Sequence, residues 1–185
     1  MEIDINQKKI SIGDKYQIFT DGSQTHRAAA KIFRIFSEIN VFDVNGDVEE
    51  ITIKRRFAFF VAKYDIAKKD GSIYELVTKS FWKSHLQCTA GMDVYDIYNH
   101  RGRKSSVYKN DKQVAWWDHA AVSWFNGDNY KIIADKDCDK LLIISLCLAV
   151  DNYASNDKEK SAVNFNIGRM GPQARAFDPN WQPKY

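Results

Sequence analysis

The chain has 185 residues, of which 44% are hydrophobic and 28% are charged, and its 27 basic and 24 acidic side chains leave a net charge of +3. This composition excludes a disordered chain, because there is ample apolar surface to bury and little net charge to oppose compaction. The length suits one sizeable core and is short for two full domains. A general nucleic-acid binder would usually be more basic, so we expect no nucleic-acid partner.

The compartment is predicted from the amino-terminal residues and the cysteines. Residues 1–9 show no basic region followed by an apolar run, so no secretory signal is apparent and we expect a cytoplasmic protein. The three cysteines, Cys88, Cys138 and Cys147, include no CxxC pair. This usage fits reduced thiols and argues against a disulfide framework.

The stretch from Tyr16 to Ala134 consists of short segments rich in Val, Ile, Phe, Tyr and Trp, separated by turn-forming pairs. Such a pattern predicts successive β-hairpins. Residues 28–39 also carry an apolar face with helical spacing, but β-branched and aromatic residues dominate there, so we favour a strand. The turn-forming pairs are Asp21-Gly22, Asn45-Gly46, Asp70-Gly71 and Asn126-Gly127.

Four glycines share a longer pattern, because an aliphatic residue stands five positions before and five positions after each of them. In a hairpin, residues equally distant from the turn lie opposite one another and bury the same face. Around Gly46, Gly71, Gly102 and Gly127, the pattern predicts that Val41 pairs with Ile51, Ile66 with Leu76, Ile97 with Val107, and Val122 with Ile132.

Residues 141–150 differ in kind, because apolar side chains occupy every face of a helix there. A helix that is hydrophobic all round must be buried all round. The run falls well short of the roughly 20 residues that cross a bilayer as a helix, so we expect no transmembrane span. With its flanks it predicts a helix over about residues 137–153, capped by Asp135 or Asp137. Its expected core residues are Leu141, Ile144 and Leu148.

Many strands followed by one buried helix predict a mostly β fold in which the sheet curls into a barrel around the helix. The helix then replaces the side chains that normally fill a barrel. Residues 155–185 contain all three prolines and no leucine, which indicates an extended tail. We therefore expect a barrel domain over residues 1–154 and a tail over 155–185 that packs on the barrel or on a neighbouring subunit.

Several segments occur in a characteristic order: an aspartate-glycine type of turn, a basic and aromatic strand, a tyrosine strand, and an apolar helix ending in aspartate. This order resembles the tubby C-terminal-like superfamily, which groups tubby domains, phospholipid scramblases and LURP-one-related proteins. The resemblance implies an antiparallel barrel of roughly 12 strands threaded by the helix. The segments that carry it are residues 41–46, 54–57, 63–66, 96–102, 116–117, 126–132 and 139–151.

The resemblance also implies a class of function. Tubby domains are associated with phosphoinositide headgroups, and scramblases with membranes, calcium and a membrane-inserting end helix. The closing apolar run here is similar to the LURP-one-related version, and no local motif matches the headgroup-binding residues of tubby. We therefore expect a non-enzymatic module, without a cofactor, that binds anionic lipid headgroups or phosphorylated ligands. The alternative is a protein-interaction or self-assembly domain that uses the tail over residues 155–185 to form a homo-oligomer.

Two basic clusters are the candidate ligand-binding residues. On a common face they would attract phosphate groups or an anionic membrane, with each basic residue contributing about 1 kcal/mol near such a surface. The simpler interpretation is a solvated strand edge and a solvated turn, because alternation along a strand sends Arg55 to the face opposite its two neighbours. The candidate residues are Lys54, Arg56, Arg101, Arg103 and Lys104.

Other reactive residue types lack a supporting pattern. Asp135, Asp137 and Asp139 resemble the opening of a calcium loop, but Lys140 and Leu146 stand where that loop needs glycine and glutamate, so helix capping is favoured. The histidines show no metal-ligand spacing, and we expect no metal site. Cys138 lies near the start of the helix, where the neighbouring aspartates should raise the pKa of its thiol, and we expect no catalytic residue.

Overall fold

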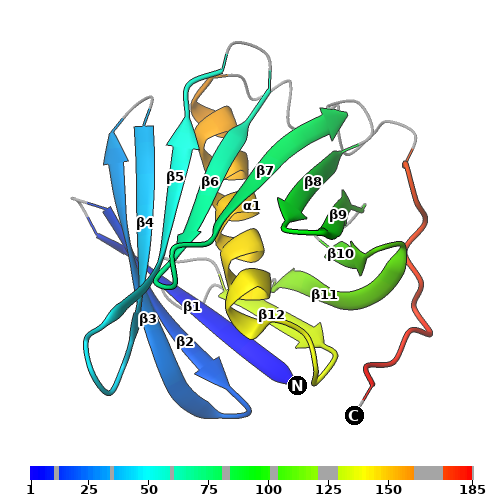
Figure 1. Ribbon diagram of the computed structural model, residues 1–185, viewed down its shortest axis with the longest axis horizontal. Coiled ribbons are helices and arrows are strands. Elements are labelled where there is room, and N and C mark those ends of the chain that lie inside the picture. Colours follow the sequence, from blue (N-terminus) through cyan, green and yellow to red (C-terminus); the bar gives the residue numbers. More distant parts are fainter. Residues whose placement is uncertain are drawn as a thin grey trace.

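The computed structural model describes residues 1–10, 13–33, 36–58, 61–80, 84–100, 104–120, 129–160 and 173–184. Within these residues, twelve antiparallel strands surround one helix (Figure 1). The strands are β1 (Glu2–Ile10), β2 (Gly13–Thr20), β3 (Ser23–Phe33), β4 (Phe36–Asp43), β5 (Glu49–Arg56), β6 (Lys63–Lys68), β7 (Ile73–Ser80), β8 (His85–Ala90), β9 (Asp93–Asn99), β10 (Lys104–Lys109), β11 (Lys112–Ala120) and β12 (Asn129–Ala134), and the helix is α1 (Lys140–Lys160).

The sheet closes on itself because β1 pairs with β2 on one side and with β12 on the other. Ile3, for example, lies opposite Thr20 of β2 and Ile132 of β12. Closure leaves none of these twelve strands with a free edge for another chain to pair with. The helix runs through the interior of this barrel (Figure 1), so the predicted fold is confirmed.

The predicted hairpin pairs are confirmed in part. Val41 lies opposite Ile51, and Ile97 lies opposite Val107, as the glycine pattern predicts. The segment around residues 28–39 is confirmed as two strands, β3 and β4.

The other two predicted pairs are wrong. Ile66 lies opposite Tyr74, because this hairpin is centred on Asp70 and the partner moves by two residues. A shift of two keeps the same face, so Ile66 and Leu76 are still fully buried. Ile132 lies opposite Trp117 of β11, and Val122 is outside the described residues.

The helix begins and ends later than predicted, at Lys140 and Lys160 instead of about 137 and 153. Its cap is Asp139, whose Oδ1 accepts a hydrogen bond from the backbone N–H of Leu142 at 3.0 Å. Asp135 and Asp137 are therefore not the cap. The helix continues past its apolar run to Lys160, so residues 155–160, expected to begin the extended tail, are helical instead.

The centre of the barrel is filled by the apolar run of α1. Ile144 and Leu148 are fully buried, as predicted, whereas Leu141 is half-buried and packs at the edge of the core. None of the described residues form a helix that combines the length and the apolar character needed to cross a membrane.

The antiparallel order gives the barrel two different ends. One end, here called the turn rim, carries the connections β2–β3, β4–β5, β6–β7, β8–β9 and β10–β11 and the start of α1. The opposite end, the loop rim, carries the other six connections between consecutive strands. Strand β5 ends at the loop rim with Arg56, and β10 begins there with Lys104. Arg56 and Lys104, one residue from each basic cluster, therefore lie at the loop rim.

The described part of the tail, residues 173–184, runs in extended form along the outside of the barrel (Figure 1). Near its end, the backbone N–H of Lys184 donates to Oδ1 of Asp135 at 2.7 Å. The backbone carbonyl of Lys184 accepts a hydrogen bond from the backbone N–H of Lys136 at 3.0 Å. Near its start, the guanidinium of Arg175 lies 4.0 Å from the ring centre of Tyr108. These tail residues thus bind the barrel of their own chain.

Candidate functional site

Lys54 and Arg56 of β5 lie on the outer wall of the barrel and are paired with acids. Lys54 Nζ lies 3.3 Å from Oε2 of Glu38 on β4. Burial opposes ionisation of Glu38, but hydrogen bonds from Asn40 and Lys54 outweigh it, and the pKa of Glu38 is lowered. Such exposed ion pairs add little stability, but they do reduce the charge that Lys54 offers to a ligand.

Arg56 is held by two acids at once. Its guanidinium lies 3.0 Å from Oδ1 of Asp65 and also hydrogen-bonds to Glu75. Because Asp65 and Glu75 are directly opposite one another on β6 and β7, Arg56 separates two like charges. In the isolated chain, Arg56 therefore neutralises two carboxylates on the outer wall of the barrel.

Lys104 has a different environment, over two aromatic rings. Its Nζ lies 5.3 Å from the ring centre of Trp116 and 4.9 Å from that of Phe177 in the tail. Four strands separate β5 from β10, so Lys104 lies on another part of the wall from Lys54 and Arg56. The other candidates, Arg101 and Arg103, lie outside the described residues.

A groove of about 360 Å³ lies between the outer wall and the tail. Aromatic rings and two prolines form much of its lining, and Lys104 supplies a positive charge. The sequence did not predict it, because the path of the tail depends on contacts between distant residues. It is lined by Lys104, Trp116, Ile133, Phe177, Asp178, Pro179, Trp181, Gln182 and Pro183.

Phe177 anchors the tail, so Phe177→Ala should open this groove. The ring packs edge-on against His100 and Trp116, at 5.4 and 5.7 Å between ring centres. Each such contact contributes about 0.5–1.5 kcal/mol, so we expect trypsin to cleave after Arg175 about tenfold faster in the variant. Asn180→Ala, at an exposed tail position, is the control. Equal cleavage rates in both variants would show that Phe177 does not hold the tail.

A buried polar cluster at Asp151 and Asn152, just after the apolar run of α1, links the helix to four strands. Asp151 is 5% exposed, and its carboxylate accepts hydrogen bonds from the hydroxyls of Tyr16, at 3.2 Å, and of Tyr130. The side-chain oxygen of Asn152 accepts from Ser37 at 2.6 Å and from Tyr64 at 3.0 Å. Because the donors come from β2, β4, β6 and β12, the cluster holds the loop-rim half of the barrel around α1.

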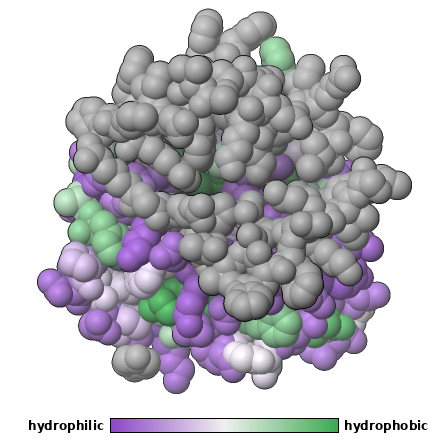
Figure 2. Space-filling view, turned by 180° about the vertical axis from the view of Figure 1, so that it is seen from behind, coloured by the Kyte–Doolittle hydropathy of each residue, from purple (hydrophilic) through white to green (hydrophobic). Residues whose placement is uncertain are grey.

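Exposed apolar residues flank the β5–β6 connection at the loop rim. Phe57 is 56% exposed and Val61 is 40% exposed. Arg55 and Lys63, on either side of them, are half-buried and make no ion pair with any residue that the structure describes. In the view of Figure 2, hydrophilic residues dominate the described surface and hydrophobic residues form small separate areas. We call Arg55, Phe57, Val61 and Lys63 the β5–β6 edge.

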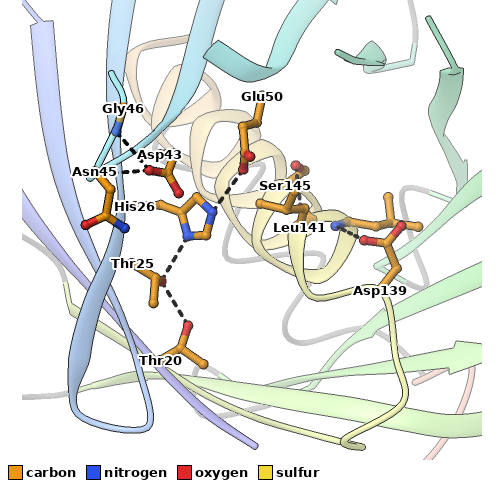
Figure 3. Close-up of polar contacts among 11 residues, drawn as sticks. Thr20, Thr25, His26, Asp43, Asn45, Gly46, Glu50, Asp139, Leu141 and Ser145 are labelled. Atoms are coloured by element: carbon orange, nitrogen blue, oxygen red, sulfur yellow. Dashed lines mark hydrogen bonds and ion pairs between the residues drawn. The ribbon is translucent and has the colours of Figure 1, made fainter. Parts of the chain in front are cut away.

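A separate cluster of possible metal ligands lies at the turn rim (Figure 3). The donor atoms of His26, Asp43 and Glu50 all lie within 4.8 Å of one another. The three residues come from β3, β4 and β5. Their spacing in the sequence matches no metal-binding motif, so sequence analysis missed the cluster.

The cysteine side chains are protonated at neutral pH. Burial raises the pKa of Cys88 to about 12 and the pKa of Cys147 well above its usual value. Burial and then the charges of Asp135, Asp137 and Asp139 raise the pKa of Cys138 to about 11, as the sequence predicted. A thiol with a raised pKa is a poor nucleophile at neutral pH.

The closed twelve-stranded barrel with a hydrophobic helix along its axis defines a protein of the tubby-like class. Residues 1–151 match the family model described as LURP-one-related, and the chain belongs to that family. The match ends at Asp151, the residue that anchors the helix, and leaves the tail outside. No curated protein and no solved structure is significantly similar to the chain.

Proposed function

We propose that this protein is a non-enzymatic binding module that attaches to anionic membrane surfaces through its loop rim. The observation that carries the proposal is the β5–β6 edge. Exposed Phe57 and Val61 lie between Arg55 and Lys63 in the sequence, and these two cations make no ion pair with any described residue. Apolar side chains at such an edge enter the headgroup region of a bilayer, while basic residues are attracted to anionic lipids by about 1 kcal/mol each.

The distribution of the cations favours a surface over a small ligand. Arg56 and Lys104 lie at the same end of the barrel but are separated by four strands. Side chains so far apart on a rim do not converge on one phosphate group, whereas a flat bilayer can meet all of them at once. Anionic headgroups would also compete with Glu38, Asp65 and Glu75 for the cations of β5.

Vesicle sedimentation tests the proposal. The full chain should sediment with vesicles that contain phosphatidylserine and remain in the supernatant with pure phosphatidylcholine. Arg55→Glu with Lys63→Glu should lower the partition coefficient at least tenfold, because two attractions of about 1 kcal/mol each become repulsions. Phe57→Ser with Val61→Ser should also lower the partition coefficient, because these variants lose the apolar side chains that enter the headgroup region.

Two variants at the turn rim serve as matched controls. Met92 is fully exposed and Lys112 is exposed, so Met92→Ser and Lys112→Glu make an apolar-to-Ser and a basic-to-Glu change at the opposite end of the barrel. Both should bind like the wild type. Equal sedimentation with neutral and anionic vesicles, or unchanged binding by the β5–β6 edge variants, would refute the proposal. Binding of inositol hexakisphosphate without any binding to vesicles would indicate a soluble phosphorylated ligand instead.

A further inference from the structure

The histidine–carboxylate cluster at the turn rim is built around a buried imidazole. His26 is 4% exposed, and its Nε2 lies 3.0 Å from Oε2 of Glu50. Asp43 lies directly opposite His26 on the neighbouring strand. One oxygen of Asp43 accepts hydrogen bonds from the backbone N–H groups of Asn45, at 2.6 Å, and Gly46, at 3.1 Å. These bonds fix the carboxylate beside the imidazole (Figure 3).

Two β-bulges bring the partners of His26 into place. The pairing of β4 with β5 shifts between Val41 and Phe42, which makes Glu50 the extra residue of that pairing. The pairing of β2 with β3 shifts in the same way, and the extra residue is Thr25. Bulges redirect side chains and are frequent beside functional sites. Here they redirect the two residues that contact the imidazole, one at each ring nitrogen.

The second ring nitrogen has the partner that a metal-bound histidine needs. His26 Nδ1 lies 2.9 Å from the hydroxyl oxygen of Thr25, which lies 3.0 Å from the hydroxyl oxygen of Thr20. A metal-binding histidine almost always donates its other N–H to such a partner, which fixes the tautomer and the orientation of the ring. With Nδ1–H donated to Thr25, the lone pair of Nε2 points toward the carboxylates.

The geometry points to a binding site for a Zn²⁺ ion held by His26, Asp43 and Glu50. Zinc bonds of 2.0–2.2 Å to nitrogen and oxygen place tetrahedral ligand atoms about 3.4 Å apart. The distance between His26 Nε2 and Glu50 Oε2, 3.0 Å, is already close to this value. Three protein ligands leave the fourth position to water. The bound ion links β3, β4 and β5 at the turn rim, independently of the membrane surface proposed at the loop rim.

The choice of zinc follows from the donor set. Imidazole suits Zn²⁺ and its transition-metal neighbours, whereas Ca²⁺ and Mg²⁺ take oxygen ligands. The two carboxylates balance the charge of a divalent cation. We therefore expect a large excess of Ca²⁺ or Mg²⁺ to leave zinc binding unchanged.

Isothermal titration of the chelator-treated full chain with ZnCl₂ tests this site. The wild type should bind one Zn²⁺ per chain at this site. Glu50→Gln keeps the shape of the side chain and should weaken binding more than tenfold, and His26→Gln should abolish it. Thr25→Val removes the partner of Nδ1 and should weaken binding about tenfold, the lower end of the range for such outer partners.

His85 provides a matched control, because its Nε2 also contacts a carboxylate, Oδ1 of Asp96, at 2.8 Å. That pair belongs to no three-ligand group among the described residues. His85→Gln should therefore bind Zn²⁺ like the wild type. Circular dichroism without metal verifies that each variant is folded, and Glu50→Gln remains decisive if His26→Gln does not fold. Absence of zinc binding in the wild type, or equal affinity in Glu50→Gln, would show that the cluster is a structural ion pair.

Discussion

Replacing Ile144 by Asp is expected to abolish folding. Ile144 is fully buried at the centre of the barrel, where twelve strands surround the helix. Burying an unpaired carboxylate there destabilises the folded state by several kcal/mol, and the loss of the well-packed aliphatic side chain destabilises it further. Because a domain is stable by about 5–15 kcal/mol, the variant should lose its soluble yield or its cooperative melting by circular dichroism. Leu148→Asp should behave in the same way.

Leu141→Asp is the matched control, since it makes the same change on the same helix at a half-buried position. The carboxylate can reach solvent there and lies in the first turn, where the helix dipole favours negative charge. This variant should fold with a moderately lower melting temperature. A soluble Ile144→Asp variant with native-like melting would contradict the burial of the helix inside the barrel.

The second large effect is expected at Asp151, where Asp151→Ala should destabilise the fold by about 3 kcal/mol. The change removes the acceptor of two tyrosine hydroxyls, from Tyr16 and Tyr130, in a buried environment. Leaving buried donors without their acceptor costs about 1–3 kcal/mol each. Urea unfolding, monitored by tryptophan fluorescence, gives the change in the free energy of unfolding.

Tyr16→Phe is the control for that experiment, because it removes one donor and leaves the acceptor with Tyr130. We expect a loss of about 1 kcal/mol. The double variant, Tyr16→Phe with Asp151→Ala, should lose less than the sum of the two single changes, since residues in contact are not additive. Additive losses would show that Asp151 stabilises the helix end independently of Tyr16.

The fold was predictable because its strongest signals are local. The apolar run from 141 to 150 identifies a buried helix, and the spacing of Val41 and Ile51 about Gly46 identifies a hairpin register. The predicted register around Gly71 was wrong, because hydrophobic spacing does not determine which turn residue lies at the centre of the hairpin. The predicted helix cap was wrong for a related reason. Several aspartates precede the helix, and Asp135 accepts a hydrogen bond from Lys184 of the tail, while Asp139 caps the helix.

The candidate sites were less predictable, because they depend on pairing between strands. Lys54 appears in the sequence as a basic residue, and its partner Glu38 becomes a neighbour through the register of β4 and β5. The cluster of His26, Asp43 and Glu50 depends further on bulges, which place an extra residue beside the imidazole. No periodicity in the sequence indicates which strand contains such a residue.

The helix that fills the barrel is also the last regular element of the described chain, after all twelve strands. During synthesis the ribosome therefore releases the surrounding sheet before the residues that must occupy its centre. Closure also requires β1 to meet β12, which are far apart in the sequence. Contacts between residues so far apart in the sequence make folding slow, and the apolar faces of the strands stay exposed until the barrel closes. The nascent chain should therefore depend on chaperones until α1 emerges, and a truncation before Lys140 should aggregate instead of forming an empty barrel.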